Sequence, residues 1–450
     1  MLFLLKKIKI WYTKNGDRMN IIDIINKKRK GFSLNYDELK FAVDGFLNGD
    51  VVDSQMSSLL MAIVINGMSD QETFDLTDIM LNSGNINDLS KINGIKVDKH
   101  STGGVGDKTS LILVPLVASC GVNVAKMSGR SLGHTGGTID KLESIPNFNV
   151  VLDKDKFIKQ VNDINIALIS QSGNLTPGDK LLYALRDTTA TVESIPLIAS
   201  SIMSKKIAAG SPNIVLDVKT GNGAFMKSLE DSKELARQMI SIGKNLNRNV
   251  IALITDMNEP LGYNIGNSLE VIEAIETLKG NGPSDLLELC IKLASNMLSL
   301  IKNIDIKECE KLVIDSINNG NALNKLKELI EYQNGNSDII NDYNLLPKSL
   351  YKYAIKSNKE GYIVGFDTEK VGITASKLGS SRSKLDDDID YGAGITLCKK
   401  INDYVNINDT IAYFYTNKED INYIANYFIE SITFDNNKLD NHKLIYETIK

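Results

Sequence analysis

The sequence has 450 residues, a formal net charge of -5, and hydrophobic and charged fractions of 42% and 24%. A chain of this length predicts two or three domains around a large core, and the composition is typical of a soluble enzyme. The net charge argues against non-specific nucleic-acid binding but leaves room for a local basic pocket.

The N-terminal residues do not predict a membrane-spanning segment, and the cysteines do not predict a disulfide framework. Met1 to Leu5 is apolar, but lysines follow directly, so the run is too short to span a membrane. We expect residues 1–18 to form an N-terminal extension. The four cysteines show no C-x-x-C spacing, which argues against a zinc site and favours a reducing cytoplasm.

The pattern of apolar residues changes along the chain. Residues 21–84 have helical periodicity, with a capping box at Ser69 and Glu72. From residue 92 short apolar runs alternate with helical stretches, which predicts an α/β domain with a mostly parallel sheet. Residues 176–209 are again helical, and β-like runs follow after residue 344. The candidate strands before that point are 122–126, 166–169, 214–218 and 250–254.

Two glycine-rich turns, at 102–107 and 135–140, indicate an anion site. Glycines let successive backbone N–H groups approach a phosphate closely, and a helix that starts at such a turn adds its positive dipole end. Neither turn has the G-x-G-x-x-G or P-loop spacing. The apolar run 111–117 between them suits a buried element. Hydroxyl and ammonium donors near the turns are Ser101, Thr102, Thr109, Ser110, Ser128, Thr138, Lys99, Lys108 and Lys126.

The amino-acid sequences of these turns also resemble the signature motifs of a known family. KHSTGGVGD at 99–107 and SGRSLGHTGGTIDKLE at 128–143 resemble the signatures of the thymidine and pyrimidine-nucleoside phosphorylases. The resemblance continues through 186–192, 194–198 and 219–226, and extends over nearly everything from Met19 onward.

The resemblance implies a fold and a domain plan. The fold is α/β, with a small all-helical domain, a large α/β domain and a C-terminal α+β subdomain. The helical domain comprises 19–84 with 176–209 and serves dimerisation and base binding. The α/β domain comprises 92–170 with 210–344 and binds phosphate across an interdomain cleft, and the subdomain comprises 345–450. A homodimer is expected.

The resemblance also assigns roles residue by residue. His100 donates a proton or hydrogen bond to the pyrimidine O2, and Arg186, Ser201 and Lys205 bind the carbonyl and N3 edge of the base. Ser201 and Lys205 are four apart, so a helix places them on one face. Inorganic phosphate is the co-substrate, with no organic cofactor. Its ligands are Lys99, Ser101, Ser110, Lys126, Ser128 and Thr138.

Some members of the family bind a potassium ion. The matching positions are Gly106, Leu261, Asn264 and Glu273. At Lys108 a small hydroxyl residue is expected as a further ligand, and an ammonium group there either repels the cation or replaces its charge. A second departure is the sequence GSSR at 379–382, where Gly-Ala-Gly-Arg is usual, which affects local loop geometry.

The resemblance therefore implies phosphorolysis of uridine, thymidine or deoxyuridine to the free base and a pentose 1-phosphate. Lys126 before Met127 favours broad specificity. Three alternatives stay open: a thymidine phosphorylase specific for deoxynucleosides, a transferase like anthranilate phosphoribosyltransferase, and a non-catalytic nucleoside-binding protein. The expected partners are nucleoside, phosphate and a second copy of the chain, without nucleic acid or membrane.

Overall fold

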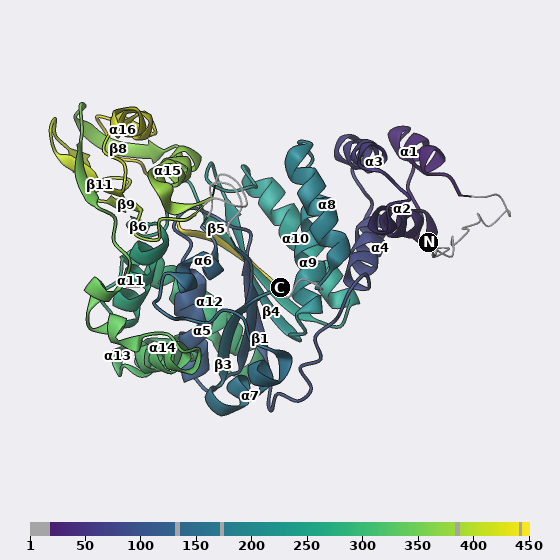
Figure 1. Ribbon diagram of the computed structural model, residues 1–450, viewed down its shortest axis with the longest axis horizontal. Coiled ribbons are helices and arrows are strands. Elements are labelled where there is room, and N and C mark those ends of the chain that lie inside the picture. Colours follow the sequence, from purple (N-terminus) through teal and green to yellow (C-terminus); the bar gives the residue numbers. More distant parts are fainter. Residues whose placement is uncertain (1–18, 131–135, 172–174, 383–387, 441–442) are drawn as a thin grey trace, which may run out of the picture. The chain divides into compact units, whose positions relative to one another are not determined.

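The computed structural model describes residues 19–130, 136–171, 175–382, 388–440 and 443–450 (Figure 1). The predicted extension 1–18 and the first residue of the second glycine turn lie outside these ranges. The described residues form two compact units. One lies within Met1–Asn87, Ser172–Gly210 and Ser241–Leu246, and the other within Asp88–Gln171, Ser211–Ile240 and Asn247–Lys450.

The first unit is a helical bundle. Leu39, Leu59 and Ile79 share its core with Leu182 and Leu197 from the later helical segment. The predicted capping box opens α4, because the Ser69 hydroxyl accepts from the Glu72 N–H and the Glu72 carboxylate accepts from the Ser69 N–H. The helices are α1 (Ile21–Arg29), α2 (Tyr36–Asn48), α3 (Asp53–Asn66), α4 (Asp70–Leu81), α8 (Pro177–Thr188) and α9 (Ile195–Ala208).

The second unit is built on a mostly parallel sheet. Strand β1 (Val97–Ser101) pairs in parallel with β4 (Asn213–Thr220), which pairs in parallel with β5 (Asn249–Asp256). The C-terminal strand β13 (Ile445–Ile449) adds antiparallel to β5. On the other side, the parallel pair β2 (Val124–Ser128) and β3 (Ile166–Ser170) joins β1 through a single bridge from Asn123 to Lys96.

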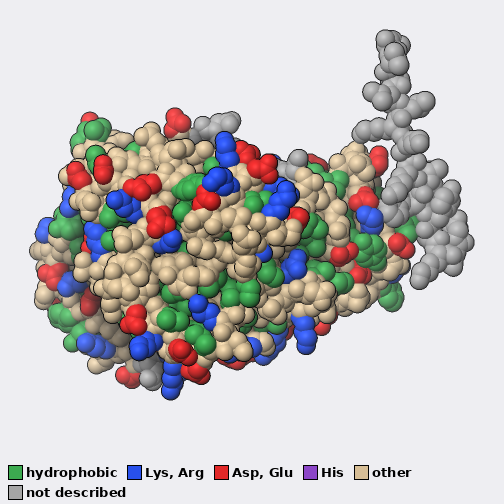
Figure 2. Space-filling view, turned by 90° about the horizontal axis from the view of Figure 1, so that it is seen from below, with side chains coloured by type: hydrophobic (Ala, Val, Ile, Leu, Met, Phe, Trp, Pro, Cys, Tyr) green, Lys and Arg blue, Asp and Glu red, His purple; other side chains and the backbone are tan. Residues whose placement is uncertain are grey.

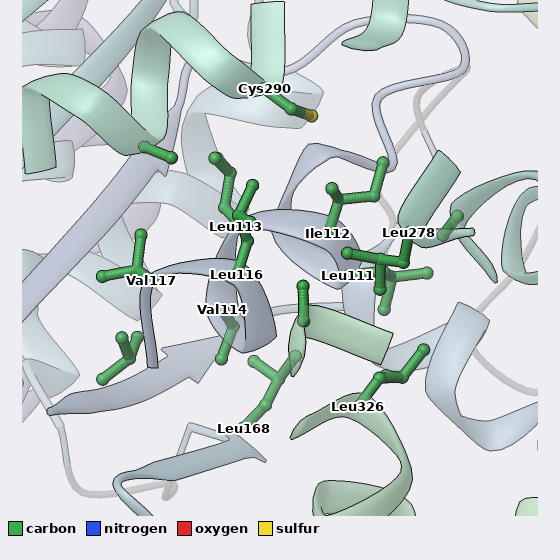
Figure 3. Packing of buried hydrophobic residues seen from close by; sticks show 14 of the residues in the cluster. Leu111, Ile112, Leu113, Val114, Leu116, Val117, Leu168, Leu278, Cys290 and Leu326 are labelled. Carbon is green, nitrogen blue, oxygen red and sulfur yellow. The ribbon is translucent and has the colours of Figure 1, made fainter. Parts of the chain in front are cut away.

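Helix α5 (Thr109–Ser119) is the centre of this unit's core. Every residue from Thr109 to Ala118 is buried, which explains the unbroken apolar run of the sequence. Figure 3 shows its side chains meeting Leu168 of β3, Leu278, Cys290 and Leu326 on different sides. The remaining helices of this part are α6 (Thr138–Glu143), α7 (Lys154–Ile164), α10 (Leu229–Asn245), α11 (Asn267–Leu278), α12 (Ser284–Lys302), α13 (Ile306–Asn318) and α14 (Asn321–Tyr332), of which α10 has its last residues, from Ser241, in the first unit.

The C-terminal part of the second unit is α+β and has its own core, which includes Ile363, Phe414 and Phe428. One sheet has the order β6-β9-β11-β7 and another the order β10-β8-β12. Its elements are η1 (Ser337–Ile340), η2 (Tyr343–Leu345), β6 (Asn264–Ile265), β7 (Tyr351–Lys356), β8 (Gly361–Phe366), α15 (Thr368–Ala375), η3 (Ser376–Ser380), β9 (Gly394–Leu397), β10 (Tyr404–Val405), β11 (Thr410–Thr416), α16 (Asn422–Ile429) and β12 (Ile432–Asp435).

The predicted fold class is therefore confirmed, with a helical bundle, an α/β domain with a parallel sheet and a C-terminal α+β part. The first predicted strand is displaced, because β2 begins at Val124 rather than at residue 122. Acidic and basic side chains are interspersed over the face shown in Figure 2. Among the helices that the structure describes, none has the length and apolar character needed to cross a bilayer.

Candidate active site

The first glycine-rich turn connects β1 to α5 at the carboxyl end of the sheet. Gly103 and Gly106 have φ values of +98° and +74°, which L-residues with a side chain rarely adopt. The hydroxyl of Ser101, the last residue of β1, accepts from the Gly103 N–H at 3.2 Å. Ser110 lies in the first turn of α5 and is 9% exposed. This strand end thus brings two of the predicted phosphate hydroxyls to one turn.

Beneath this turn Lys99 is fully buried among acidic groups. Its Nζ donates to the Thr109 hydroxyl at 2.5 Å and lies 3.4 Å from Asp217 and 3.9 Å from Asp107. Burial alone would raise the pKa of the Asp107 carboxyl, but the charges of Lys99 and Lys219 hold that pKa well below 3.8. The ammonium of Lys99 is therefore already balanced by carboxylates.

Lys126 extends from β2 to β1. Its Nζ donates to the backbone carbonyl of Lys99 and lies 3.2 Å from Asp98. Ser128, the last residue of β2, is 9% exposed and pairs in register with Ser170 of β3. The predicted phosphate residues Lys126 and Ser128 thus lie on one strand, with the lysine anchored inside and the serine at its end.

A residue that sequence reasoning missed joins the two glycine-rich turns. Lys141 of α6 is 1% exposed. Its Nζ donates to the Asp107 carbonyl of the first turn at 2.8 Å and to the Gly136 carbonyl of the second at 3.5 Å. It also forms an ion pair of 2.8 Å with Glu270. The turns therefore meet, and Thr138 begins the helix that carries the connecting lysine.

Buried charges around these turns balance one another. Five buried lysines near the turns form ion pairs with five carboxylates. The positive charge that the sequence predicted for an anion is thus largely offset within the protein. The hydroxyls and backbone N–H groups at the strand and helix ends supply the polar donors. The groups concerned are Lys99, Lys108, Lys126, Lys141, Lys219, Asp98, Asp107, Asp217, Glu270 and Glu273.

The C-terminal part reaches α6 through the GSSR segment. Arg382 Nη1 donates to Asp140 of α6 at 3.0 Å, and Asn267 donates to the Ser380 carbonyl at 2.9 Å. Gly379 has a φ of +120°. The serine substitutions in this segment are therefore compatible with a loop whose arginine contacts the helix that begins at Thr138.

His100 is half-buried on β1. Alternation along the strand turns it to the face opposite Lys99 and Ser101. The histidine and the phosphate hydroxyls thus belong to the same unit. His134 lies outside the described residues.

Three of the predicted base-binding residues, Arg186, Ser201 and Lys205, lie in the helical unit. Lys205 Nζ donates to the Ser201 hydroxyl at 2.7 Å and to Asp179 Oδ2 at 2.5 Å. Tyr183 completes the group, since Lys205 Nζ and the Arg186 guanidinium each lie 5.7 Å from its ring centroid. Asp179, Tyr183 and Arg186 recur at helical spacing on α8, a signal that could have identified Tyr183 from the sequence.

Arg186 is anchored by backbone carbonyls. Its Nε, Nη1 and Nη2 donate to Thr191, Leu197 and Val192 at 3.1, 3.1 and 2.7 Å. Burial lowers the pKa of Arg186 to about 10, against the charge of Asp179. The side chain therefore fixes the connection between α8 and α9, and two of its five N–H donors are not used by these carbonyls.

The residues predicted to bind potassium do converge, but around an ammonium group. Lys108 Nζ donates to the carbonyls of Leu261 and Asn264 and to the Glu273 carboxylate. Nζ lies 2.9, 2.7 and 2.5 Å from these three oxygens, so the ammonium occupies the position that a potassium ion would take. These residues do not fit a potassium ion.

Family models match each part of this architecture. A model of the α/β domain of a glycosyl transferase family matches residues 93–323, and one of its helical bundle domain matches residues 22–84. The C-terminal domain of pyrimidine nucleoside phosphorylases matches residues 362–435. Bundle, sheet and strand-end turns together define a glycosyl transferase of this family.

Curated relatives show which branch of this glycosyl transferase family the chain belongs to. The pyrimidine-nucleoside phosphorylase of Staphylococcus epidermidis is 54% identical over 418 residues, covering 93% of this chain and 96% of the relative. That of Staphylococcus aureus (strain MSSA476) is 51% identical over 433 residues, covering 95% and 100%. The chain belongs to the pyrimidine-nucleoside phosphorylase family.

A solved structure shares the fold at much lower identity. The anthranilate phosphoribosyltransferase of Thermus thermophilus has a TM-score of 0.56 and 16% identity, covering 70% of this chain and 100% of its own. At this identity the likeness concerns the fold alone, and it gives the transferase alternative no support from the site.

Proposed function

We propose that the protein catalyses the reversible phosphorolysis of pyrimidine nucleosides. Uridine, thymidine or deoxyuridine reacts with phosphate to give the free base and ribose or deoxyribose 1-phosphate. The observation that carries the proposal is the junction of two glycine-rich turns through Lys141 at the ends of β1 and β2. Membership of the family supports the choice of nucleoside.

Phosphate is held by hydroxyls at the strand and helix ends, those of Ser101, Ser110, Ser128 and Thr138. The buried ammonium groups of Lys99 and Lys126 add a positive electrostatic potential at the phosphate site, although their ion pairs with carboxylates reduce that potential. No general base is needed, because phosphate is already an anionic nucleophile. This accounts for an anion site built from hydroxyls and amides.

The reaction moves two electron pairs. A lone pair of a phosphate oxygen forms the new bond to C1′, while the C1′–N bond breaks and the electron pair of the broken bond passes to the pyrimidine. His100 donates a proton or hydrogen bond to O2, while Arg186, Ser201 and Lys205 bind the carbonyl and N3 edge. Donors aimed at the developing charge stabilise the transition state more than the ground state. A positioned acid contributes about 10²–10⁴-fold.

Three further expectations belong to the proposal. The protein acts as a homodimer, with the helical domain (19–84 with 176–209) serving dimerisation and base binding. The domain of 92–170 with 210–344 binds phosphate, and residues 345–450 form the C-terminal subdomain. A cytoplasmic location is supported by the four cysteines, which are free thiols in the structure.

The test is an ultraviolet assay of uridine and thymidine cleavage, each with and without phosphate. Wild type should release base from both substrates only with phosphate, and His100→Ala should be at least about 10²-fold slower. His442→Ala, at the histidine farthest in sequence from both glycine turns, is the control. Cleavage of thymidine alone would favour a deoxynucleoside-specific enzyme, and no cleavage of either substrate by folded protein would refute the proposal.

A further inference from the structure

Lys108 lies in an oxygen cage at the start of α5. Its Nζ lies 2.9 Å from the Leu261 carbonyl, 2.7 Å from the Asn264 carbonyl and 2.5 Å from Glu273 Oε2. A lysine ammonium has three N–H donors, and these oxygens accept all three. The cage therefore satisfies the ammonium completely, with oxygens drawn from the segment after β5 and from α11.

Two further oxygens beside the cage already accept hydrogen bonds from backbone N–H groups. The Gly106 carbonyl, which the family resemblance would give to a metal, accepts from the backbone N–H of Lys108 at 2.9 Å. The second carboxylate oxygen of Glu273 accepts from the Tyr263 N–H at 3.0 Å. Gly262 has a φ of +70°, and an added Cβ would lie 3.1 Å from Lys108 Nζ. The backbone is thus folded closely around this side chain.

The ammonium is paired with a carboxylate inside the cage. The Lys108 side chain is fully buried, and its Nζ forms an ion pair of 2.5 Å with Glu273, whose side chain is 6% exposed. A buried carboxylate needs a cation or hydrogen-bond donors, and the ammonium of Lys108 supplies both at this position.

We propose that the Lys108 ammonium takes the place of a monovalent metal cation at this site, so that the protein needs no potassium. The ammonium connects the glycine turn at 102–107 with the loop at 261–264 and with α11. A metal-binding relative would obtain the same connection from solution. This goes beyond the proposed reaction, since it concerns what fixes the phosphate turn rather than the chemistry performed there.

The proposal predicts that a potassium requirement can be created. Lys108→Ser removes the ammonium, leaves two carbonyls and a carboxylate around the vacated volume, and adds a hydroxyl oxygen. Carbonyl oxygens of this kind replace the hydration shell of potassium. Lys108→Met, in contrast, fills the same volume without a charge, so potassium should not restore it.

The experiment measures melting temperature and uridine phosphorolysis in potassium chloride and in choline chloride at equal ionic strength. Choline is too large for the cage, so the comparison removes general salt effects. Wild type should give the same values in both salts. Lys108→Ser should melt at least about 5 °C below wild type in choline and regain most of that loss in potassium. Lys108→Met should stay low in both.

Lys28→Ser is the matched control. Lys28 is equally buried, at 2% exposure, and pairs with Glu72 at 2.7 Å, without the two carbonyls that surround Lys108. Its destabilisation should therefore be the same in both salts, since one carboxylate does not form a potassium cage.

Each contrary outcome overturns the proposal. A wild-type protein that loses stability or activity in choline requires a metal cation despite Lys108. A Lys108→Ser variant that is no better in potassium, or is unfolded in both salts, shows that the ammonium does not stand in for potassium. Melting is independent of catalysis, so absence of phosphorolysis would refute the proposed function without affecting this result.

Discussion

Lys205 illustrates how one side chain's surroundings decide between a surface lysine and a base-binding one. Its Nζ lies against Asp179 and Ser201 and near the Tyr183 ring. Lys205→Met keeps the bulk and removes the charge, so kcat/KM for uridine should fall by about 10²–10³-fold, because a donor to the leaving base is lost. The KM for phosphate should not change. Steady-state kinetics in both substrates measures this.

The control for this variant is Lys180→Met, at an exposed lysine of α8. It should behave as wild type. Because Lys205→Met leaves the buried Asp179 without its ammonium, the melting temperature must be measured alongside the kinetics to separate folding from catalysis. If Lys205→Met has wild-type kinetics, Lys205 contributes only to the helical unit's structure.

For single residues, the sequence predicts which side chains belong to the candidate site better than it predicts which groups contact them. The i, i+4 spacing of Ser201 and Lys205 places them together, and the structure confirms their contact. The partners of Lys205, Asp179 and Tyr183, lie on another helix. Helical spacing on α8 groups Asp179 and Tyr183 with Arg186, but it cannot give their contacts with Lys205 of α9, and those contacts required the structure. The roles in base binding stay predictions.

At the scale of elements, the side chain of Lys141 connects the two glycine-rich turns. Lys141→Met removes the donor to the Asp107 and Gly136 carbonyls and leaves Glu270 buried without its cation. We expect a loss of about 3–5 kcal/mol in the free energy of unfolding. The KM for phosphate should rise while that for uridine stays constant. Urea denaturation and kinetics measure the two effects.

A double variant separates charge from packing at this junction. In Lys141→Met with Glu270→Gln, the carboxylate is also neutral, so part of the lost stability should return. The KM for phosphate should stay high, because the turns remain unconnected. If the double variant simply sums the two single losses, the ion pair does not couple these residues.

Helices and strands with a clear apolar pattern could be predicted from the sequence. Those whose polar residues are buried by contacts with distant elements were harder to predict. The unbroken apolar run 111–117 predicts burial, and α5 is buried on every side. Strand β1 was missed, because Asp98, Lys99 and His100 interrupt its apolar pattern. Lys99 is buried with Asp107 and Asp217 as ion-pair partners, and Asp98 with Lys126, and all three partners come from other elements.

Over the whole molecule, the order of apolar periodicities predicts the helical part and the mostly parallel α/β part, and the family resemblance supplies the C-terminal α+β subdomain. Helical spacing up to residue 84, alternating runs to residue 344 and β-like runs beyond follow the succession of bundle, parallel sheet and C-terminal α+β part. The balance of buried lysines and carboxylates could not be predicted, since a net charge of -5 says nothing about which charges are buried. That balance required the pairing of strands and helices.

The same buried charges predict how the whole molecule responds to acid. Burial raises the pKa of Glu72, but hydrogen bonds from the Leu34 N–H and Lys28 bring it below 4.5. In the other unit, burial is likewise outweighed for Asp285, where Lys400 and the Gly262 N–H lower the pKa below 3.8, and for Asp107, where Lys99 and Lys219 lower it. Both units therefore contain carboxyls that bind protons more readily when unfolded.

A carboxyl with a depressed pKa in the folded state contributes its full stability above the unfolded pKa and loses it as the pH falls through the folded value. We therefore expect the urea midpoint to be nearly constant from pH 7 to about pH 5 and to fall steeply below about pH 4. Circular dichroism in urea at a series of pH values measures this. Glu72→Gln should lower the midpoint at neutral pH and flatten its acid dependence, because the variant has lost the carboxyl whose protonation drives part of the fall. A Glu72→Gln protein with the wild-type acid slope would contradict a role for this carboxyl in acid unfolding.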